Sequence, residues 1–336
     1  MADMSKLPLT SGYLLKERNS GMMDEKISRR GFFKRLGGLA VAITPVGGLA
    51  SLTSCSVGKE RSPRLVVLHT NDVHSHIDPF PSTDARYAGL GGYARRQAFI
   101  EKVIAEEGAD NVLVFESGDM FQGTPYFNFF KGQLEMQLMN RMHIDAVTIG
   151  NHEFDNGVGG LCDCMETANF PFVCSNYKFS DPRGSQLVKP YKVFERGGMR
   201  VGVFGLGVRL EGLVAPANCS GVDFQDLVPT AQSMADLLRG RERCDVVIAL
   251  THIGYNDEPN GECDTWLAAN TSGIDLILGG HSHTFMPAPD LVRAKDGRTV
   301  LINQVGFGGV NVGKIELAAQ PIGGVAMIKA APVTMC

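Results

Sequence analysis

The sequence lacks the features that mark zinc-ribbon, redox and nucleic-acid-binding proteins. Its eight cysteines include no CxxC pair, and the tightest spacing, Cys162-Asp163-Cys164, argues against a zinc ribbon or a thioredoxin-like site. It has no long basic tract and a formal net charge of -4, so a polymeric nucleic acid is not indicated as a partner. After residue 60 it has no internal repeat and no low-complexity linker. With 336 residues, 44% of them hydrophobic, it can bury one large core or two ordinary ones.

The N-terminal segment has a composition of its own. Paired Arg29-Arg30 precede a weakly apolar run, rich in Gly and Ala, that ends at Cys55. Ser28–Lys34 (SRRGFFK) resembles a twin-arginine export signal. A transmembrane helix or a basic amphipathic stretch is the alternative, but the glycines and proline of the run disfavour a lasting span. We therefore expect residues 1–55 to be an N-terminal extension and export signal.

Two further features concern processing of this segment. Leu52–Cys55 (LTSC) resembles a bacterial lipobox, in which the cysteine is lipidated and becomes the new N-terminus. A signal-peptidase cut nearby is the alternative. Because such signals usually begin only a few residues before the paired arginines, Met22 or Met23 is a candidate start. The expected location is the periplasm of a bacterium, either free or tethered to the membrane through a lipidated Cys55.

After a linker over residues 56–63, the pattern alternates between strands and helices. Apolar runs predict strands over 65–68, 112–115, 146–149, 245–250 and 274–278. Helical spacing predicts helices over 91–107, 133–142 and 157–168. Hairpins are expected at Gly197-Gly198 and Asp296-Gly297, with two more strands before residue 317. This order predicts one layered α/β domain over residues 64–336.

Five polar clusters each directly follow an apolar run. They are Asp72-Val73-His74, Gly118-Asp119, Gly150-Asn151-His152-Glu153, His252 and Gly280-His281-Ser282-His283. One such cluster is more often a satisfied polar group than a ligand. Five predict a shared site, because loops after the strands of an open α/β sheet converge where ligands bind. Carboxylate, imidazole and amide donors without thiolate suit two cations, and the histidines favour Zn, Mn, Fe or Co over Mg or Ca.

The set D-x-H, G-D, G-N-H-E, H and G-H-x-H, in this order, resembles the calcineurin-like metallophosphoesterases. TNDVHSH, SGDMFQGTPYFN, GNHEFDNG and GGHSH are similar to its 5′-nucleotidase-type branch, over roughly residues 64–317. The resemblance implies an α/β/β/α sandwich with a dimetal site in the loops after the strands. It also implies hydrolysis of phosphate esters, above all nucleotides, in reactions of the 5′-nucleotidase or 2′,3′-cyclic phosphodiesterase type.

The resemblance also implies a role for each site residue. The first metal would be held by Asp72, His74, Asp119 and His283. The second would be held by Asp119, Asn151, His252 and His281, with Asp119 bridging. A hydroxide between the metals would attack phosphorus, while a His152–Asp155 dyad stabilises the phosphoryl centre or assists the leaving group. Asp155 lies close enough in sequence to orient the His152 imidazole and favour its charged form, and Glu153 is expected to steady the turn.

Departures from the family's pattern leave alternatives open. Ser75 stands where the family often has glycine, and His283 where some nucleotidases have glutamine. The family's two-domain enzymes continue into a C-terminal domain that clamps the nucleoside, whereas this chain stops near that boundary, at Cys336. The alternatives are therefore an enzyme for small or generic phosphate esters, and a catalytic or weakly active subunit with a separately encoded nucleotide-binding partner. A thiosulfohydrolase-like enzyme acting on sulfur esters is a further alternative, although those enzymes also carry a second domain and the length does not favour them.

Several other aromatic and histidine side chains have structural interpretations. Phe129 and Phe130 of FNFFKG are expected in the core, with a substrate-facing aromatic patch as the alternative. His69 and His76 flank the first metal motif, and neither is predicted to be a ligand, although His76 could face the site. His143, at a helix end, is expected to be structural.

Overall fold

The computed structural model describes residues 63–256, 261–320 and 324–336, all within one compact unit, Lys59–Cys336. The predicted export signal with Arg29-Arg30 and Cys55, and all but the last residue of the predicted linker, lie outside the described residues. These features therefore stay predictions. Within the described part of the chain, no helix is long and apolar enough to cross a membrane.

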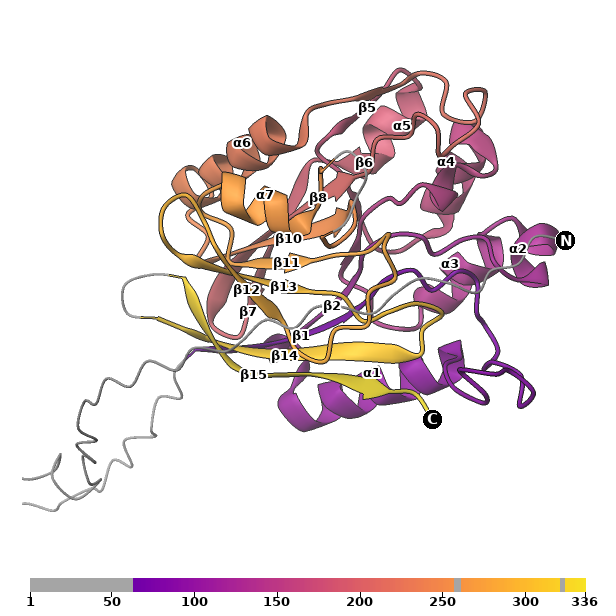
Figure 1. Ribbon diagram of the computed structural model, residues 1–336, viewed down its shortest axis with the longest axis horizontal. Helices are drawn as coiled ribbons and strands as arrows, with labels where there is room; N and C mark the ends of the chain where they lie inside the picture. Colours follow the sequence, from indigo (N-terminus) through magenta and orange to yellow (C-terminus); the bar gives the residue numbers. More distant parts are fainter. Residues whose placement is uncertain (1–62, 257–260, 321–323) are drawn as a thin grey trace, which may run out of the picture. The chain divides into compact units, whose positions relative to one another are not determined.

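Two mixed sheets form the centre of this unit (Figure 1). The seven-stranded sheet has the order β15-β14-β1-β2-β3-β4-β6. Its strands are β1 Arg64–Thr70, β2 Val112–Glu116, β3 Ala146–Val147, β4 Phe172–Val173, β6 Val188–Lys189, β14 Asn311–Ala319 and β15 Val325–Thr334. The strands from β1 to β6 in this order run parallel, whereas β14 and β15 are antiparallel additions at one edge.

The six-stranded sheet has the order β12-β13-β11-β10-β8-β7. Its strands are β7 Tyr191–Arg196, β8 Met199–Gly207, β10 Val246–His252, β11 Leu276–Leu278, β12 Asp290–Arg293 and β13 Thr299–Asn303. The two predicted hairpins are confirmed, because β7 pairs with β8 and β12 with β13 in antiparallel register. A small third sheet pairs β5 Tyr177–Phe179 with β9 Val222–Phe224.

Helices cover the outer faces of both sheets. They are α1 Tyr93–Glu107, α2 Pro125–Phe130, α3 Gln133–Met139, α4 Gly157–Thr167, α5 Pro182–Leu187, α6 Leu227–Gly240 and α7 Asp264–Asn270, with short 3₁₀ turns at Ala109–Asn111 and His152–Phe154. In Figure 1, α1 lies below the first sheet, whereas α6 and α7 lie above the second. The predicted α/β/β/α sandwich is confirmed.

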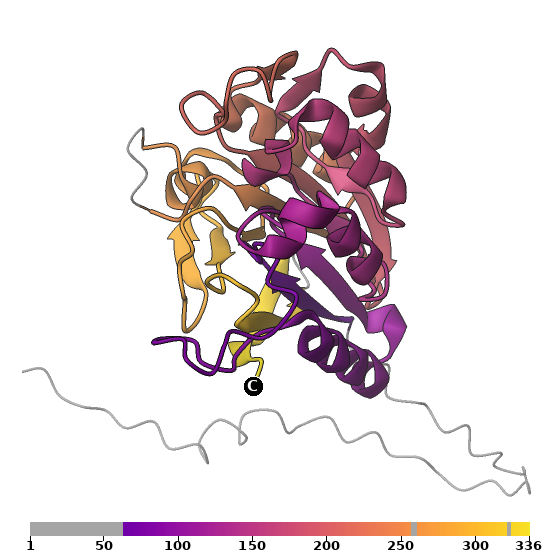
Figure 2. The ribbon, with the colours of Figure 1, turned by 90° about the vertical axis from the view of Figure 1, so that its right-hand side faces the viewer.

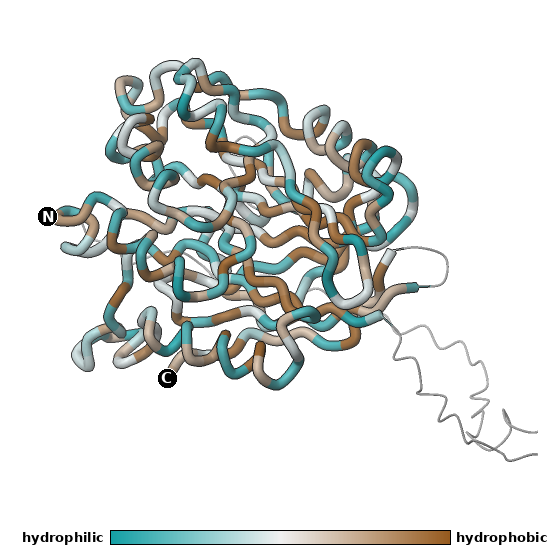
Figure 3. Tube along the Cα trace, turned by 180° about the vertical axis from the view of Figure 1, so that it is seen from behind, coloured by the Kyte–Doolittle hydropathy of each residue, from teal (hydrophilic) through white to brown (hydrophobic). Residues whose placement is uncertain are grey.

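Alternation along β1 explains this layering. Leu65 and Val67 are buried between the two sheets, in a cluster that includes Ile248 of β10. Val66 and Leu68 point to the other face and join a cluster that includes Ile100 of α1. Successive side chains of a strand point to opposite faces, so a strand covered on both sides needs a continuous apolar run. Figure 3 shows the matching pattern, with hydrophobic central strands and more hydrophilic segments around them.

Predictions about several elements differ from the structure. Two more strands were expected between the second hairpin and residue 317, but the described residues there form one, β14. The sequence pattern did not indicate α6, because two of its four buried residues are alanines, Ala231 and Ala235, and Pro229 masks its first turn. A proline is tolerated there, since first-turn N–H groups have no partner within the helix. The prediction that Phe129 and Phe130 are in the core is wrong: they are 81% and 49% exposed. The one-and-a-half-turn helix α2 buries a single face, which Phe127 occupies.

Candidate metal centre

All five polar clusters meet at the carboxyl ends of strands from both sheets. Asp72 follows β1, Asp119 follows β2 and Asn151 follows β3, all in the first sheet. His252 ends β10 and His281 follows β11, both in the second sheet. Figure 2 shows the purple and magenta first half of the described chain beside its orange and yellow second half. The site therefore lies where the two sheets adjoin, and each sheet contributes part of it.

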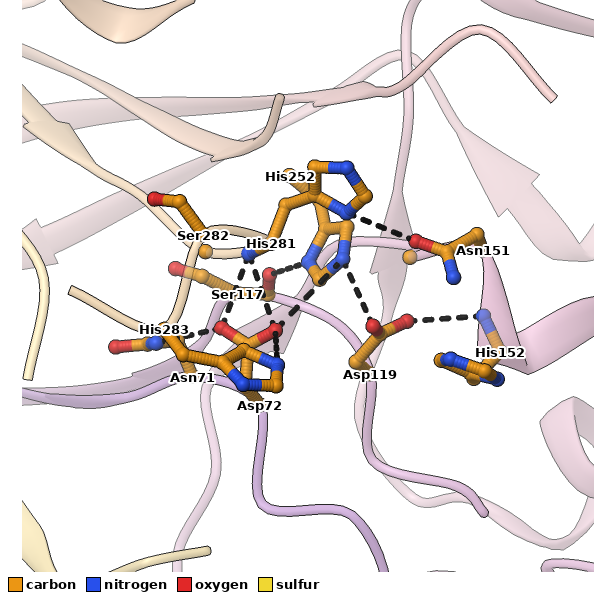
Figure 4. Close-up of polar contacts among 12 residues, drawn as sticks. Asn71, Asp72, Ser117, Asp119, Asn151, His152, His252, His281, Ser282 and His283 are labelled. Atoms are coloured by element: carbon orange, nitrogen blue, oxygen red, sulfur yellow. Dashed lines mark hydrogen bonds and ion pairs between the residues drawn. The ribbon is translucent and has the colours of Figure 1, made fainter. Parts of the chain in front are cut away.

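The first predicted ligand set is assembled around Asp72, which is fully buried. His283 Nε2 lies 3.3 Å from Asp72 Oδ1, and His74 Nε2 lies 3.9 Å from the same oxygen. The Nε2 atoms of His74 and His283 face each other at 3.0 Å. His74 Nε2 is also 3.8 Å from Oδ2 of Asp119. Asp72, His74 and His283 form a group that could hold one cation, and Asp119, whose contacts Figure 4 shows in part, adjoins this group through His74.

The second predicted set shares Asp119 with the first. His252 Nε2 lies 3.1 Å from Asp119 Oδ2, and one ligand atom each of Asp119, His252 and His281 lie within 4.8 Å of one another. Asn151 Oδ1 faces His281 Nδ1 at 3.0 Å. The structure thus brings all seven predicted ligands into two adjoining groups with Asp119 between them.

The chemistry of the donors fits cations. His252 Nδ1 donates to the carbonyl oxygen of Ser117 at 2.7 Å, which directs the buried Nε2 toward the site and the Asp119 carboxylate. Burial holds the pKa of His74 below its ordinary value and lowers that of His281 to about 4, so both rings are neutral at pH 7, the form that binds metals.

The electrostatic potential at the candidate metal centre is negative. Burial alone would lower the pKa of His252, yet the adjacent carboxylates of Asp119 and Asp72 raise it to about 10. Two buried carboxylates with few positive partners are costly unless a positive charge lies between them. The described residues therefore form buried His/Asp clusters consistent with a dimetal site.

His152 and Asp155 form the predicted pair beside this centre. His152 Nδ1 lies 2.9 Å from Asp155 Oδ2, and this hydrogen bond raises the pKa of the imidazole. The His152 backbone N–H donates to Asp119 Oδ1 at 2.9 Å, which ties the pair to the shared carboxylate. One ligand atom each of His152, His74 and Asp119 also lie within 4.8 Å of one another, so distance alone does not separate a dyad from a further ligand.

Glu153 fixes the loops that carry Asp119 and Asn151. It is 1% exposed and accepts hydrogen bonds from the backbone N–H groups of Asp119 (2.8 Å), Met120 (2.7 Å) and Gly150 (2.6 Å). One carboxylate thus joins the loop after β2 to the loop after β3. This matches the turn-supporting role predicted from the sequence.

Strained backbone is concentrated at the ligands. Asp72, His74, Asp119, His281 and His283 all have φ between 45° and 78°. A non-glycine residue in this region costs of order 1–3 kcal/mol, and such residues cluster where function requires a fixed geometry. Ser75, which replaces the family's glycine, has φ 55° as well.

Asn71 is a positioning residue that the sequence interpretation missed. Its Nδ2 donates to Asp72 Oδ2 (2.6 Å) and to the Gly306 carbonyl (2.7 Å), while its Oδ1 accepts from the N–H of Val305 (2.9 Å). Asn71 therefore ties Asp72 to the segment after β13. Its place directly before D-x-H was the available signal, but its partners lie more than 230 residues away in sequence.

The remaining histidines near the first motif have other surroundings. His69 is buried in β1, where burial lowers its pKa to about 3 and its Nε2 lies 2.8 Å from Nδ2 of Asn303. His76 stacks on Phe80, with ring centroids 4.2 Å apart. Neither histidine belongs to the metal-type groups of the described residues, and their exclusion as ligands stays a prediction.

This fold and this site define a calcineurin-like phosphoesterase. The family model of that name, calcineurin-like phosphoesterase, matches residues 65–285, and the chain belongs to this family. Its relatives include the snake venom 5′-nucleotidase of Crotalus adamanteus, which is 32% identical over 294 residues, 81% of this chain and 48% of that protein. The chain is accordingly a member of this phosphoesterase family that is related to the 5′-nucleotidases.

Solved structures of nucleotidases are also similar to this chain. The 5′-nucleotidase precursor from Thermus thermophilus superposes with a TM-score of 0.73 at 34% identity, covering 81% of this chain and 54% of that one. The NAD nucleotidase of Haemophilus influenzae superposes with a TM-score of 0.72 at 26% identity, covering 81% and 50%. The chain thus spans about half the length of the curated relatives it matches.

Proposed function

We propose that this protein hydrolyses phosphate esters of nucleotides, as a 5′-nucleotidase or a 2′,3′-cyclic phosphodiesterase. The observation that carries the proposal is the pair of His/Asp clusters that share Asp119 beside the His152–Asp155 pair. Relatives named 5′-nucleotidase and NAD nucleotidase support a nucleotide as the substrate. The chain matches about half the length of those relatives, so we include a nucleotide-binding partner in the proposal.

Seven residues would hold two divalent cations, in the order predicted from the sequence. They are Asp72, His74, Asp119 and His283 for the first cation, with Asp119, Asn151, His252 and His281 for the second. When bound, the two cations supply a water of lowered pKa as the nucleophile and neutralise charge on the phosphoryl group. The transition metals Zn, Mn, Fe and Co suit this imidazole-rich set.

His152 supplies a positive charge from the protein that complements the negative charge of the phosphoryl group. Its Nδ1 is engaged by Asp155, so Nε2 is the nitrogen that donates a proton or hydrogen bond toward the phosphoryl oxygens or the leaving group. The side chains of His152 and Asp155 are 32% and 31% exposed, which leaves them accessible to a substrate. The hydrogen bond to Asp155 orients the His152 ring. It also raises the pKa of the ring, so His152 stays charged at higher pH than an isolated histidine.

A substrate panel with two variants tests this proposal. Metal-loaded protein is assayed, with and without a candidate partner protein, for phosphate release from AMP and p-nitrophenyl phosphate. The same samples are assayed for ring opening of 2′,3′-cyclic AMP to AMP isomers and for p-nitrophenol release from bis(p-nitrophenyl) phosphate. Asp119→Asn is expected to lose both metal and activity. His152→Asn is expected to keep the metals while turnover falls on the order of a hundredfold or more.

Metal analysis separates the possible failures. Loss of metal from His152→Asn would mean that His152 is a ligand. The protein could bind two metals and still hydrolyse none of the esters, either by itself or with the partner protein. That result would contradict the proposal that it hydrolyses nucleotide phosphate esters. Sulfate release from a thiosulfate ester under the same conditions would favour the sulfur-ester alternative instead.

We also propose that the protein is exported by the twin-arginine route, because Arg29-Arg30 lie in the matching sequence SRRGFFK. Replacing both arginines with lysine is expected to retain the protein in the cytoplasm. We propose as well that Cys55 is lipidated, so replacing it with alanine is expected to abolish labelling by a palmitate analogue. Cell fractionation that finds the lysine variant still exported would exclude this route.

A further inference from the structure

A group of aromatic side chains borders the first half of the metal centre. We call Tyr87, Phe285 and Phe307 the aromatic rim. The Phe307 ring stacks on His283, with ring centroids 5.2 Å apart and an interplanar angle of 14°. Phe285 follows His283 by two residues, and it is tied to the segment before Phe307 by a β-bridge to Val305. The rim therefore begins directly at a predicted metal ligand.

The rim continues away from the metals through ring contacts. Tyr87 lies 5.7 Å from Phe307 and stacks on Phe285 at 5.6 Å with an interplanar angle of 18°. Phe80, which is buried, supports the rim from below, 5.3 Å from Tyr87 and 5.7 Å from Phe307. The rim thus joins three segments, the loop between β1 and α1 and the segments after β11 and β13.

Packing accounts for Phe80 but not fully for the three rim residues. Phe80 is 7% exposed, whereas Tyr87, Phe285 and Phe307 are each only partly buried. The Arg86 guanidinium lies over the outer part of the rim, with Cζ 5.2 Å from the Tyr87 ring centroid and 5.9 Å from that of Phe285. Partly exposed rings with an arginine over them form the kind of surface that binds a flat aromatic group.

We propose that the aromatic rim binds the base of a nucleotide whose phosphate occupies the metal centre. This inference rests on the proposed function and assigns a base-binding surface to the metal-binding domain itself. A base stacked on Tyr87 or Phe285 would be held by its π-face, and Arg86 could donate to its ring nitrogens or carbonyl oxygens. Because every base has a π-face, the surface would accept purines and pyrimidines alike.

The experiment compares AMP with ribose 5-phosphate, which carries the same phosphate ester without a base. The ratio of their kcat/KM values is measured for the metal-loaded protein and for Tyr87→Ala and Phe285→Leu. Each variant is expected to lower the ratio roughly tenfold, the scale of one lost base-stacking contact. Tyr87→Phe keeps the ring and should preserve the ratio. Phe129→Ala, an exposed phenylalanine on α2, is the matched control and should change neither substrate.

A second measurement does not depend on turnover. Binding of adenosine to the metal-loaded protein is followed by saturation-transfer NMR, and Tyr87→Ala is expected to lose the signal that wild type and Phe129→Ala retain. If esters are hydrolysed but the AMP to ribose 5-phosphate ratio is the same in all variants, the rim only packs around His283. If no ester is hydrolysed, the proposed function fails, and the adenosine titration still decides whether the rim binds a base.

Discussion

Single residues at this site are held in place by partners that are remote in sequence. Ser75 has φ 55°, and its hydroxyl donates to Oε1 of Glu135 at 2.5 Å and accepts from Oγ1 of Thr124 at 3.0 Å. Glu135 is fully buried, so it needs this donor. The sequence motifs identified each candidate ligand, but they carried no information about Glu135, because nothing in the pattern links residues 60 positions apart.

Two substitutions at Ser75 separate its hydrogen bonds from its backbone strain. Both Ser75→Ala and Ser75→Gly should destabilise the protein by about 1–3 kcal/mol, because Glu135 loses its donor. The glycine variant should be the more stable of the two by about 1 kcal/mol, because glycine adopts a positive φ without a steric penalty. Urea unfolding in EDTA measures both without a contribution from metal binding. Equal stability of the two variants would show that the backbone at Ser75 is unstrained.

The sequence predicted the strands and helices whose apolar residues have a strong periodicity. It did not predict edge strands whose apolar pattern is weak. β15 has Lys329 and Pro332 within it, and these fit an exposed edge strand but dilute the apolar pattern. The order of strands in each sheet could not be predicted either, because β14 pairs with β1 across almost the whole domain. The loops after the strands were the most informative about the site, because their Asp, Asn and His side chains identify them without any periodic pattern.

Close approach between loops explains the glycines that precede the ligands. A Cβ on Gly150 would lie 2.2 Å from Oδ1 of Asp119, and one on Gly280 would lie 2.8 Å from Nδ1 of His252. Each loop therefore contacts a ligand of its neighbour so closely that no side chain fits between them. The repeated glycine in G-D, G-N-H-E and G-H-S-H is thus a packing requirement as well as part of a motif.

Gly150→Ala is therefore expected to displace Asp119 and to lower metal affinity roughly tenfold to a hundredfold. Its far-UV circular dichroism should stay that of wild type, because the residue lies outside the regular elements. Gly240→Ala, at the end of α6 with open space around the added methyl group, is the control and should bind metal normally. Metal content and calorimetric titration measure the effect. Full occupancy of both sites in Gly150→Ala would contradict this account of the loops.

At the scale of the whole domain, the site joins the two sheets. Asp72, Asp119 and Asn151 extend from the first sheet, whereas His252, His281 and His283 extend from the second. Cations bound between them would link the layers in the folded state alone. A ligand that binds only the folded state stabilises it by about 2.7 kcal/mol at a hundred times its dissociation constant.

Removal of the metal should accordingly lower the Tm of the wild-type protein, and Tm should rise again with increasing free metal. Asp119→Asn, which lacks the shared ligand, should show a Tm that does not depend on metal. Differential scanning calorimetry against a series of buffered metal concentrations measures this. An identical Tm for chelated and metal-loaded wild type would show that the cations do not couple the sheets.

The contact between His74 and His283 has a consequence for biosynthesis. These residues are 209 positions apart, yet their ring nitrogens face each other across one half of the centre. A ribosome must therefore finish nearly the entire domain before the last ligands of either cluster exist. The two predicted ligand sets are complete only once His281 and His283 have been synthesised, so metal binding at this centre must follow synthesis of most of the domain.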